Sequence, residues 1–387
     1  MAASIIDQAH ERARETYRSQ IGRPRDELVT PALILDLEAM RRNLAFMRDR
    51  MATMPTNLRA HVKVHKSPHI ARMQVEYGAI GIGCATVWEA VVQARAGIPD
   101  VFVINQLVGR EKTRTAALLA RESLLRVAVD DRVQADGLSA AAVEVGSTIG
   151  VLVEVDTGMH RCGTESMEET LAVARRVAEL PGLAFQGITG YEGALLMDEP
   201  DPDQRVIKAA GARDYFSGTA DLLARNGLPC EIITAAGTVN WELDAADPRL
   251  TEIQPGSYAT MDGVHKDLEP RFEQATTVLS TCVSVRSNRF VIDAGGKTVG
   301  GPGARIKACG VPEGRFEEEH GIFTRDDASF PIAVGDRVEL LCVYTPFAVG
   351  YFDAYHVVEN GRVVDVWPVM PRGPESRWLL EMLEKGE

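Results

Sequence analysis

Strand patterns and helix patterns alternate through about two thirds of the chain, and no other feature of the sequence limits the fold as strongly. Apolar, β-branched runs typical of strands are separated by segments with apolar residues at helical spacing. The predicted strands are residues 58–64, 80–84, 101–104, 125–129, 150–155, 184–189, 231–235 and 252–254. About eight strand–helix repeats over roughly 200 residues predict a (β/α)8 TIM barrel rather than an open, doubly wound sheet.

The sequence changes character after about residue 270. Helical patterns end there, and short β-branched runs such as 289–292 and 337–343 are separated by turns. We therefore expect a TIM barrel over residues 28–268, followed by a mostly-β domain over residues 269–387. Residues 1–27 read as a charged N-terminal extension, for which packing on the β-domain is one expectation.

Composition narrows the class of partner and the compartment. The 387-residue chain carries a net charge of −13, which argues against nucleic acid and anionic membranes as partners. No apolar run approaches the roughly 20 residues that span a bilayer, and the polar N-terminus resembles no signal or transit peptide. The six cysteines have no CxxC spacing, which argues against a structural zinc site. We expect free thiols in a reducing, cytoplasmic environment.

Two histidines and two lysines lie within six residues, from His61 to Lys66. The alternation around them predicts a strand with His61, Lys63 and His65 on one face. Burial of an unpaired ammonium is costly, so an inward lysine is typical of a desolvated amine that forms a Schiff base. A solvated strand end without a chemical role is the alternative that these residues leave open.

Polar residues and glycines follow most of the predicted strands, at the end of a barrel where function gathers. Gly237-Thr238 follows the seventh strand, and Gly256-Ser257-Tyr258 follows the eighth. Amides, hydroxyls and a phenol can donate to phosphate oxygens, and TIM barrels often bind phosphate after these two strands. An inward lysine together with a phosphate cradle suggests pyridoxal phosphate.

Several segments resemble the D-threonine aldolase and D-serine dehydratase family of pyridoxal-phosphate enzymes. They include TPALILDLEAMRRNLAFM, LRAHVKVHKSPHIARMQ, GAIGIGCATVWEA, LVEVDTGMHRCG and PGSYATMD. The resemblance covers nearly all of residues 28–370 in the same order. It implies the alanine-racemase-like fold, a TIM barrel followed by a β-domain, a Schiff-base lysine and a head-to-tail homodimer with shared active sites.

The resemblance also assigns candidate site residues. Lys63 is similar to the lysine that forms the Schiff base, and Lys66 to the second lysine of the family. His61 and His65 are candidate catalytic groups, with packing or support of other groups as the alternative for each. The remaining candidate cofactor contacts are Arg161, near the ring, and Tyr191, Gly237, Thr238, Ser257 and Tyr258. For Tyr191 a place in the core is the alternative.

The sequence departs from the family at its metal site. The aldolases and dehydratases of the family carry a His-x-Asp or His-x-Cys pair in the β-domain. Counting back without gaps from Trp367 places that pair at Tyr344 and Pro346, neither of which is a good ligand for Zn²⁺ or Mn²⁺. Asp353 and His356 are a displaced alternative, but positions i and i+3 of a strand point to opposite faces. We therefore expect no metal site and no divalent metal.

These observations predict an enzyme that acts on a small D-amino acid through a Lys63 Schiff base. Aldol cleavage of a β-hydroxy-D-amino acid without a metal is the favoured hypothesis, because retro-aldol cleavage needs only a base, such as His61, His65 or Tyr344. A metal-independent racemase or epimerase that uses Lys63 and Tyr344 is an alternative, as is a D-serine dehydratase-like ammonia-lyase. A more remote alternative is a non-catalytic carrier of the cofactor.

Overall fold

The computed structural model describes residues 5–199, 201–301, 303–306, 314–325, 331–372 and 377–385. Within these ranges the chain forms two compact units, each assembled from distant parts of the sequence. The first unit combines Met1–Phe46, Val64–Ile70 and Ser257–Gly373, and the second combines Met47–Lys63, Ala71–Gly256 and Pro374–Glu387. Cys309, one of the predicted free thiols, lies outside the described residues; the five other cysteines are free.

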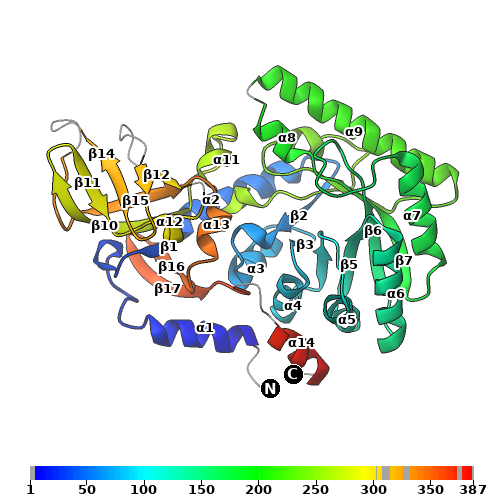
Figure 1. The fold of residues 1–387 in the computed structure, drawn as a ribbon, viewed down its shortest axis with the longest axis horizontal. Coiled ribbons are helices and arrows are strands. Elements are labelled where there is room, and N and C mark those ends of the chain that lie inside the picture. Colours follow the sequence, from blue (N-terminus) through cyan, green and yellow to red (C-terminus); the bar gives the residue numbers. More distant parts are fainter. Residues whose placement is uncertain are drawn as a thin grey trace. The chain divides into compact units, whose positions relative to one another are not determined.

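The second unit is built around a closed barrel of eight parallel strands, which confirms the predicted fold class (Figure 1). Each predicted strand has a counterpart close to its expected position. The strands are β2 (Asn57–His61), β3 (Gly81–Cys84), β4 (Asp100–Val103), β5 (Leu124–Val129), β6 (Ile149–Glu154), β7 (Leu183–Thr189), β8 (Ile232–Ala235) and β9 (Glu252–Ile253). Pairing of Asn57 with Glu252 closes the barrel between its first and last strands.

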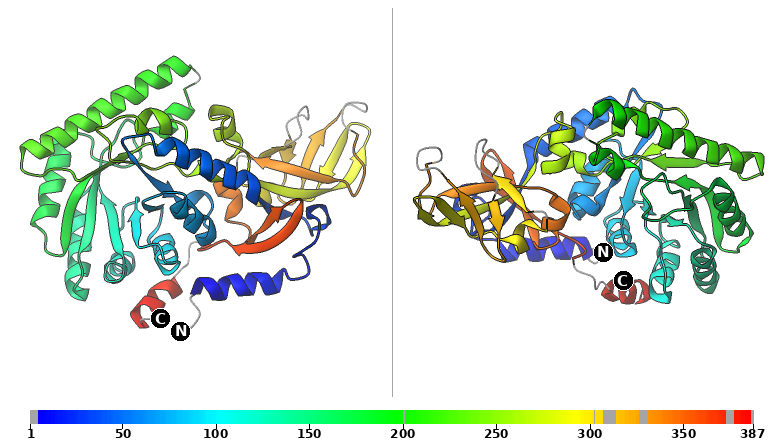
Figure 2. Two further views of the ribbon diagram at one scale, coloured as in Figure 1. Left: turned by 180° about the vertical axis from the view of Figure 1, so that it is seen from behind. Right: turned by 45° about the horizontal axis from the view of Figure 1, so that its top comes forward.

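Amphipathic helices connect the strands and lie outside the barrel (Figures 1 and 2). They include α4 (Val87–Arg95), α5 (Arg110–Leu119), α6 (Arg132–Val145), α7 (Met167–Glu179) and α9 (Pro202–Arg225), with the short helices α8 (Gly193–Met197) and α10 (Trp241–Ala245). The side chains of Thr86, Asp131 and Ser166 cap α4, α6 and α7 by accepting hydrogen bonds from first-turn amides. Such caps satisfy amides that have no partner inside a helix, so the local sequence defines where each helix begins.

A layer of charged side chains lies inside the barrel near the start of the strands. Arg59 of β2 donates to Glu252 of β9 at 2.8 Å and to Asp100 of β4 at 2.7 Å. Arg126 of β5 also pairs with Asp100. One step further along the strands, the interior becomes apolar, where Phe102 and other residues form a buried cluster. The charged layer therefore links strands from both sides of the closure.

The first unit contains a sheet in the order β13-β14-β11-β10-β1-β16-β17, with β15 pairing to both β10 and β12. Its strands are β1 (Ala32–Asp36), β10 (Thr276–Arg286), β11 (Arg289–Ile292), β12 (Ala304–Ile306), β13 (Gly314–Phe316), β14 (Gly321–Thr324), β15 (Arg337–Cys342), β16 (Ala354–Glu359) and β17 (Arg362–Pro368). Strand β1 comes from the N-terminal part of the chain. It pairs antiparallel with β10 and parallel with β16, so this sheet needs both ends of the sequence.

Helix α1 (Ile5–Thr16) lies along β17 of the same unit (Figures 1 and 2). His10 Nε2 lies 3.2 Å from the carboxylate of Asp365, and Arg14 Nη1 lies 2.5 Å from it. Trp367 donates to the same carboxylate from Nε1 at 3.1 Å. A single aspartate of the sheet thus holds the helix by two side chains, those of His10 and Arg14.

The expectation that helices end near residue 270 is wrong. Helices α12 (Gly296–Val299), α13 (Thr345–Val349) and α14 (Arg377–Lys385) follow that point. The first two have fewer than six residues, too short for a helical period to be recognised in sequence. Helix α14 buries Leu379, Leu380, Met382 and Leu383, and it belongs to the barrel unit. No helix among the described residues has the length and apolarity to cross a membrane.

Candidate active site

Lys63 lies in a tight turn rather than on a strand, which corrects the predicted strand 58–64. Strand β2 ends at His61, and Val62–Val64 form a 3-10 turn. The His61 backbone N–H donates to Pro255 O at 3.1 Å, and the Lys63 backbone N–H donates to His61 Nδ1 at 3.3 Å. Since the imidazole accepts this amide, His61 ends the strand locally. His61, Lys63 and His65 therefore do not share one strand face.

The side chains of Lys63, Tyr191 and Arg161 lie together at the ends of β2, β7 and β6. Lys63 Nζ lies 5.6 Å from the centroid of the Tyr191 ring, and Arg161 Cζ lies 5.6 Å from the same centroid. Burial, and then the positive charge of Arg161, lower the pKa of Lys63 below its usual value. A lowered pKa raises the fraction of neutral amine, the nucleophilic form, at neutral pH.

Two glycines leave room for the Tyr191 ring. A Cβ atom at Gly193 would lie 2.8 Å from the ring, and one at Gly237 would lie 3.0 Å from it. The hydroxyl of Thr238, next to Gly237, is buried and has no hydrogen-bond partner among the described residues. An unpaired buried hydroxyl is costly, so it is suited to donate to a bound acceptor such as a phosphate.

Strained backbone marks the same strand-end loops. Lys66, His160 and Ala236 have positive φ angles of 49°, 53° and 71° although none of them is glycine. Lys66 lies in the loop after Lys63, His160 directly precedes Arg161, and Ala236 directly precedes Gly237. Strain of this kind costs about 1–3 kcal/mol per residue and is concentrated at functional sites.

Acidic and amide side chains stand behind Arg161. Its Nη2 lies 3.8 Å from Glu154 Oε1, and Gln106 Nε2 donates to the other oxygen of Glu154. Asp130 accepts from the Gly163 backbone N–H at 2.8 Å, which holds the loop that carries Arg161. Burial raises the pKa of Glu154. The hydrogen bond from Gln106 and the charge of Arg161 act in the opposite direction and offset part of this increase. These contacts limit the freedom of the Arg161 guanidinium over the Tyr191 ring.

His65, Ser257 and Tyr258 belong to the first unit. His65 is fully buried, its Nδ1 accepts the Ser67 backbone N–H at 3.0 Å, and its carbonyl accepts from the Tyr355 hydroxyl at 3.0 Å. These contacts favour the structural alternative for His65. Ser257 and Tyr258 are buried in a 3-10 turn, where the Tyr258 ring packs against Phe272.

Tyr344 also belongs to the first unit, directly before α13. Its ring stacks on that of His265 with centroids 6.2 Å apart, and His265 Nδ1 lies 2.8 Å from Asp262 Oδ1. His265 and Asp262 are both buried. Among the described residues no group of three His, Cys, Asp or Glu side chains could hold a metal ion. A phenol and a proline are poor ligands for Zn²⁺ or Mn²⁺, so Tyr344 and Pro346 themselves do not fit a divalent metal.

Asp353 and His356, the displaced alternative for the metal pair, each contact other side chains. Asp353 forms an ion pair with Arg372. His356 lies in β16, where its buried ring packs edge-on against Tyr17 with centroids 5.0 Å apart. Tyr17 also forms a hydrogen bond with the Asp353 side chain, so one tyrosine contacts both residues of the pair.

Sequence reasoning missed the polar groups that support the site. Glu192 follows Tyr191, and Asn240 closes the Gly237 loop, but neither was singled out. Asp262 and His265 were missed in the same way. The only signals were a Glu between two glycines in GYEG and an Asp directly after the PGSYATM segment.

The barrel-unit residues fit pyridoxal phosphate. A desolvated amine lies at the end of β2, an aromatic ring and a guanidinium lie beside it, and an orphaned hydroxyl follows β8. The amine could hold the aldehyde of the cofactor, the aromatic ring and the guanidinium could hold its pyridine ring, and the hydroxyl could hold its phosphate.

Comparison with known proteins agrees with this fold and site. The model of the family "Alanine racemase, N-terminal domain" matches residues 35–263, and that of "Putative serine dehydratase domain" matches residues 275–358. The chain is 34% identical to D-threonine aldolase of Arthrobacter sp. over 92% of this chain and 96% of the relative. It is 33% identical to 3-hydroxy-D-aspartate aldolase of Paracoccus denitrificans, over 91% and 94% of the two chains.

A solved structure is similar over the same length. The crystal structure of D-threonine aldolase from Filomicrobium marinum matches with a TM-score of 0.87 and 36% identity, covering 92% of this chain and 98% of that one. The fold, the two family matches and these relatives define an alanine-racemase-like barrel protein with a second, serine-dehydratase-type domain. The chain belongs to the family of D-threonine aldolases and their D-serine dehydratase-like relatives.

Proposed function

We propose that this chain is a pyridoxal-phosphate-dependent lyase that cleaves a β-hydroxy-D-amino acid by a retro-aldol reaction. The observation that supports this most is the stack of Lys63, Tyr191 and Arg161 in a chain whose relatives are named aldolases. When bound, the cofactor stabilises negative charge at the substrate's Cα.

Lys63 is the amine that holds the cofactor covalently. Its lowered pKa raises the fraction of neutral amine, and its Nζ lies 5.6 Å from the centroid of the Tyr191 ring. Arg161 stays close to the ring because Glu154 lies behind it. Thr238 donates from its orphaned hydroxyl to the phosphate, beside the Gly237 loop.

In this proposal Tyr344 first loses its phenolic proton to solvent, and the phenolate then takes the proton of the substrate's β-hydroxyl, in place of metal activation. The support is chemical: Tyr344 stands where the relatives' metal ligand is expected, and the His265–Asp262 pair lies beside its ring. A positioned base contributes about 10²–10⁴-fold to a rate. Tyr344→Phe should therefore lose about that factor in cleavage while its affinity for the cofactor is unchanged. Cleavage at the wild-type rate would contradict the role of Tyr344.

A racemase or epimerase is the second candidate, and the same Tyr344 supports it. A base that returns a proton to Cα from the face opposite Lys63 would invert the amino acid without any metal. The chemical support for Tyr344 as a proton-transfer group is equal for both reactions, and relatedness to aldolases favours cleavage.

Incubation of the cofactor-loaded protein with D-threonine, D-phenylserine and D-alanine, with and without EDTA, separates the candidates. We expect glycine and an aldehyde from the two β-hydroxy substrates, at equal rates in both conditions. Optical inversion without cleavage would support the racemase instead. Turnover that EDTA abolishes would overturn the metal-free assignment.

We also propose a cytoplasmic homodimer whose active sites are shared between subunits. The five free cysteines suit a reducing compartment, and the dimer rests on the family resemblance. Analytical ultracentrifugation tests the dimer, for which we expect twice the mass of the 42.2 kDa chain.

A further inference from the structure

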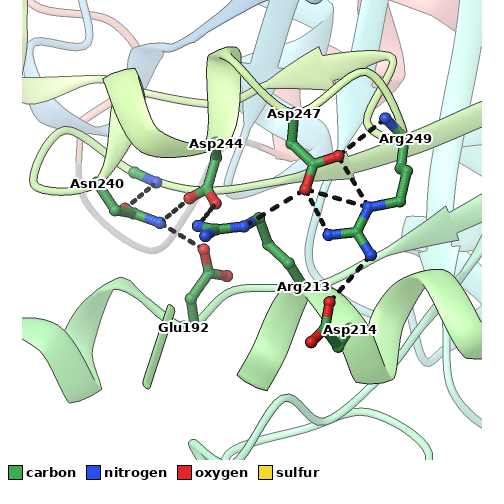
Figure 3. Close-up of polar contacts among 8 residues, drawn as sticks. Glu192, Arg213, Asp214, Asn240, Asp244, Asp247 and Arg249 are labelled. Carbon is green, nitrogen blue, oxygen red and sulfur yellow. Dashed lines mark hydrogen bonds and ion pairs between the residues drawn. The ribbon is translucent and has the colours of Figure 1, made fainter. Parts of the chain in front are cut away.

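A polar network connects the loop that carries Tyr191 and Glu192 to the loop that carries Gly237. The reaction described above does not use this network. Figure 3 shows Asn240 between Glu192, on the loop after β7, and Asp244 of α10. The Asn240 side-chain amide donates to both carboxyl groups, and its Oδ1 accepts the Gly237 backbone N–H at 3.0 Å. The bond to Glu192 crosses from one loop to the other, and the bonds with Asp244 and Gly237 fix Asn240 within its own segment. The Tyr191 segment and the Gly237 segment are therefore joined through one amide.

Only one of the two carboxyl groups has a counter-charge. Arg213 Nη1 lies 2.6 Å from Asp244 Oδ1, and Arg213 Nε lies 3.5 Å from Asp247. Arg249 pairs with Asp247 at 2.6 Å and with Asp214 at 2.9 Å (Figure 3). The two arginines are thus fully engaged with the three aspartates. No cation among the described residues pairs with Glu192.

Glu192 is therefore held as a neutral carboxylic acid. It is 3% exposed, and the Asn240 amide donates to its Oε1. Burial, and then the charge and hydrogen bond of Asp244, raise the pKa of Glu192 to about 8. An ionised Glu192 would place an unpaired charge in the interior beside a second carboxylate, which costs several kcal/mol.

We propose that protonated Glu192 is a positioning residue, which holds Tyr191 and the Gly237 loop in the geometry that binds the cofactor. Loss of its proton places two negative charges on either side of Asn240. The Tyr191 and Gly237 loops then separate, and the cofactor is released. This inference rests on the proposed function, because Tyr191 and Gly237 matter here as cofactor contacts.

Cofactor affinity should change with pH in opposite directions for Glu192 and Lys63, which allows their effects to be distinguished. Neutral amine at Lys63 increases with pH, so Lys63 alone makes cofactor binding stronger at higher pH. Ionisation of Glu192 has the opposite effect and weakens binding by about tenfold for each pH unit above its pKa. The charged groups that face Glu192 through Asn240 and Asp244 are those of Arg213 and Asp247.

The experiment measures the affinity of the apo-protein for pyridoxal phosphate between about pH 7 and about pH 10, by quenching of tryptophan fluorescence. Glu192→Gln keeps an uncharged group of the same size, and Asp214→Asn is the matched control, because Asp214 is an exposed carboxylate of the same network. We expect wild type and Asp214→Asn to lose affinity above about pH 8. We expect Glu192→Gln to equal wild type at neutral pH and to keep its affinity at alkaline pH.

The outcomes distinguish the proposed function from the role of Glu192. A wild type that binds no cofactor at any pH overturns the proposed function. If wild type binds the cofactor and the Glu192→Gln variant loses affinity at alkaline pH as wild type does, the role of Glu192 is overturned. Weaker binding of Glu192→Gln at neutral pH does the same.

A second variant covers the case in which Glu192→Gln does not fold. Asp244→Asn removes the second of the two negative charges that face each other across Asn240, so the loss of affinity at alkaline pH should be smaller than in wild type. An unchanged alkaline profile in Asp244→Asn overturns the proposal.

Discussion

At the scale of single residues, the Tyr191 ring is the contact that Lys63 and Arg161 share. Lys63 Nζ and Arg161 Cζ each lie 5.6 Å from the ring centroid, and the ring's quadrupole attracts positive charge. The residues around Lys63 pointed to it from the sequence, and the family resemblance brought forward Arg161 and Tyr191. Sequence reasoning could not find Glu192, Asn240 and Asp244 as a group, because their contacts depend on the packing of loops that are distant in the sequence.

The cation contacts of Tyr191 lead to a residue-scale prediction. Tyr191→Phe keeps the ring, so its affinity for pyridoxal phosphate should stay within a factor of about three of wild type. Tyr191→Ala removes both contacts, each worth about 0.5–1 kcal/mol, and should weaken the affinity by about tenfold. Titration of the two apo-proteins with the cofactor measures the difference. Equal affinities for the Phe and Ala variants would mean that the ring does not hold these cations.

At the scale of elements, the site depends on where strands stop. The alternation of apolar residues extends to Val64, but the His61 imidazole ends β2 three residues earlier by accepting the Lys63 amide. A hydrogen bond from the backbone to a particular ring nitrogen has no periodic signature, so the pattern could not predict the turn. The barrel helices were predicted well, because long amphipathic segments with capping residues carry a strong local signal.

The docking of α1 leads to a prediction at the element scale. Burial alone would raise the pKa of Asp365, but the Val366 amide, His10 and Arg14 lower it overall. A lowered pKa in the folded state gives stability that is present above the unfolded pKa, about 4, and lost as pH falls below it. Hydrogen exchange of residues 5–16 should therefore become faster in acid, and Asp365→Asn should show faster exchange already at neutral pH. Exchange that neither acid nor the substitution changes would contradict this docking contact.

At the scale of the whole molecule, the sequence order of strands and helices was enough to predict the barrel. The composition of the two units was not predictable from that order. Residues 64–70 belong with the sheet unit although they directly follow Lys63, and residues 374–387 return to the barrel unit. Such assignments depend on long-range packing, which local periodicity does not contain.

The charged layer inside the barrel leads to a prediction about global stability. Arg59→Met would leave buried Glu252 without its cation, and removal of one partner of a buried pair costs about 3–5 kcal/mol. Arg176→Met removes an exposed ion pair with Asp136 and should cost at most about 1 kcal/mol. The free energies of unfolding in urea measure both losses. Similar losses for the two variants would mean that the charged layer does not hold the barrel closed.

The central claim, that Lys63 is the amine of a cofactor-dependent site, is tested most directly by chemical trapping. The protein is loaded with pyridoxal phosphate, reduced with borohydride, digested and analysed by mass spectrometry. Lys66 is the internal control, because it lies three residues away and is also partly buried. We expect the added mass on Lys63 alone, with no labelling in Lys63→Ala and normal labelling in Lys66→Ala. Labelling of Lys66 with Lys63 unmodified, or none on either lysine, would contradict the assignment.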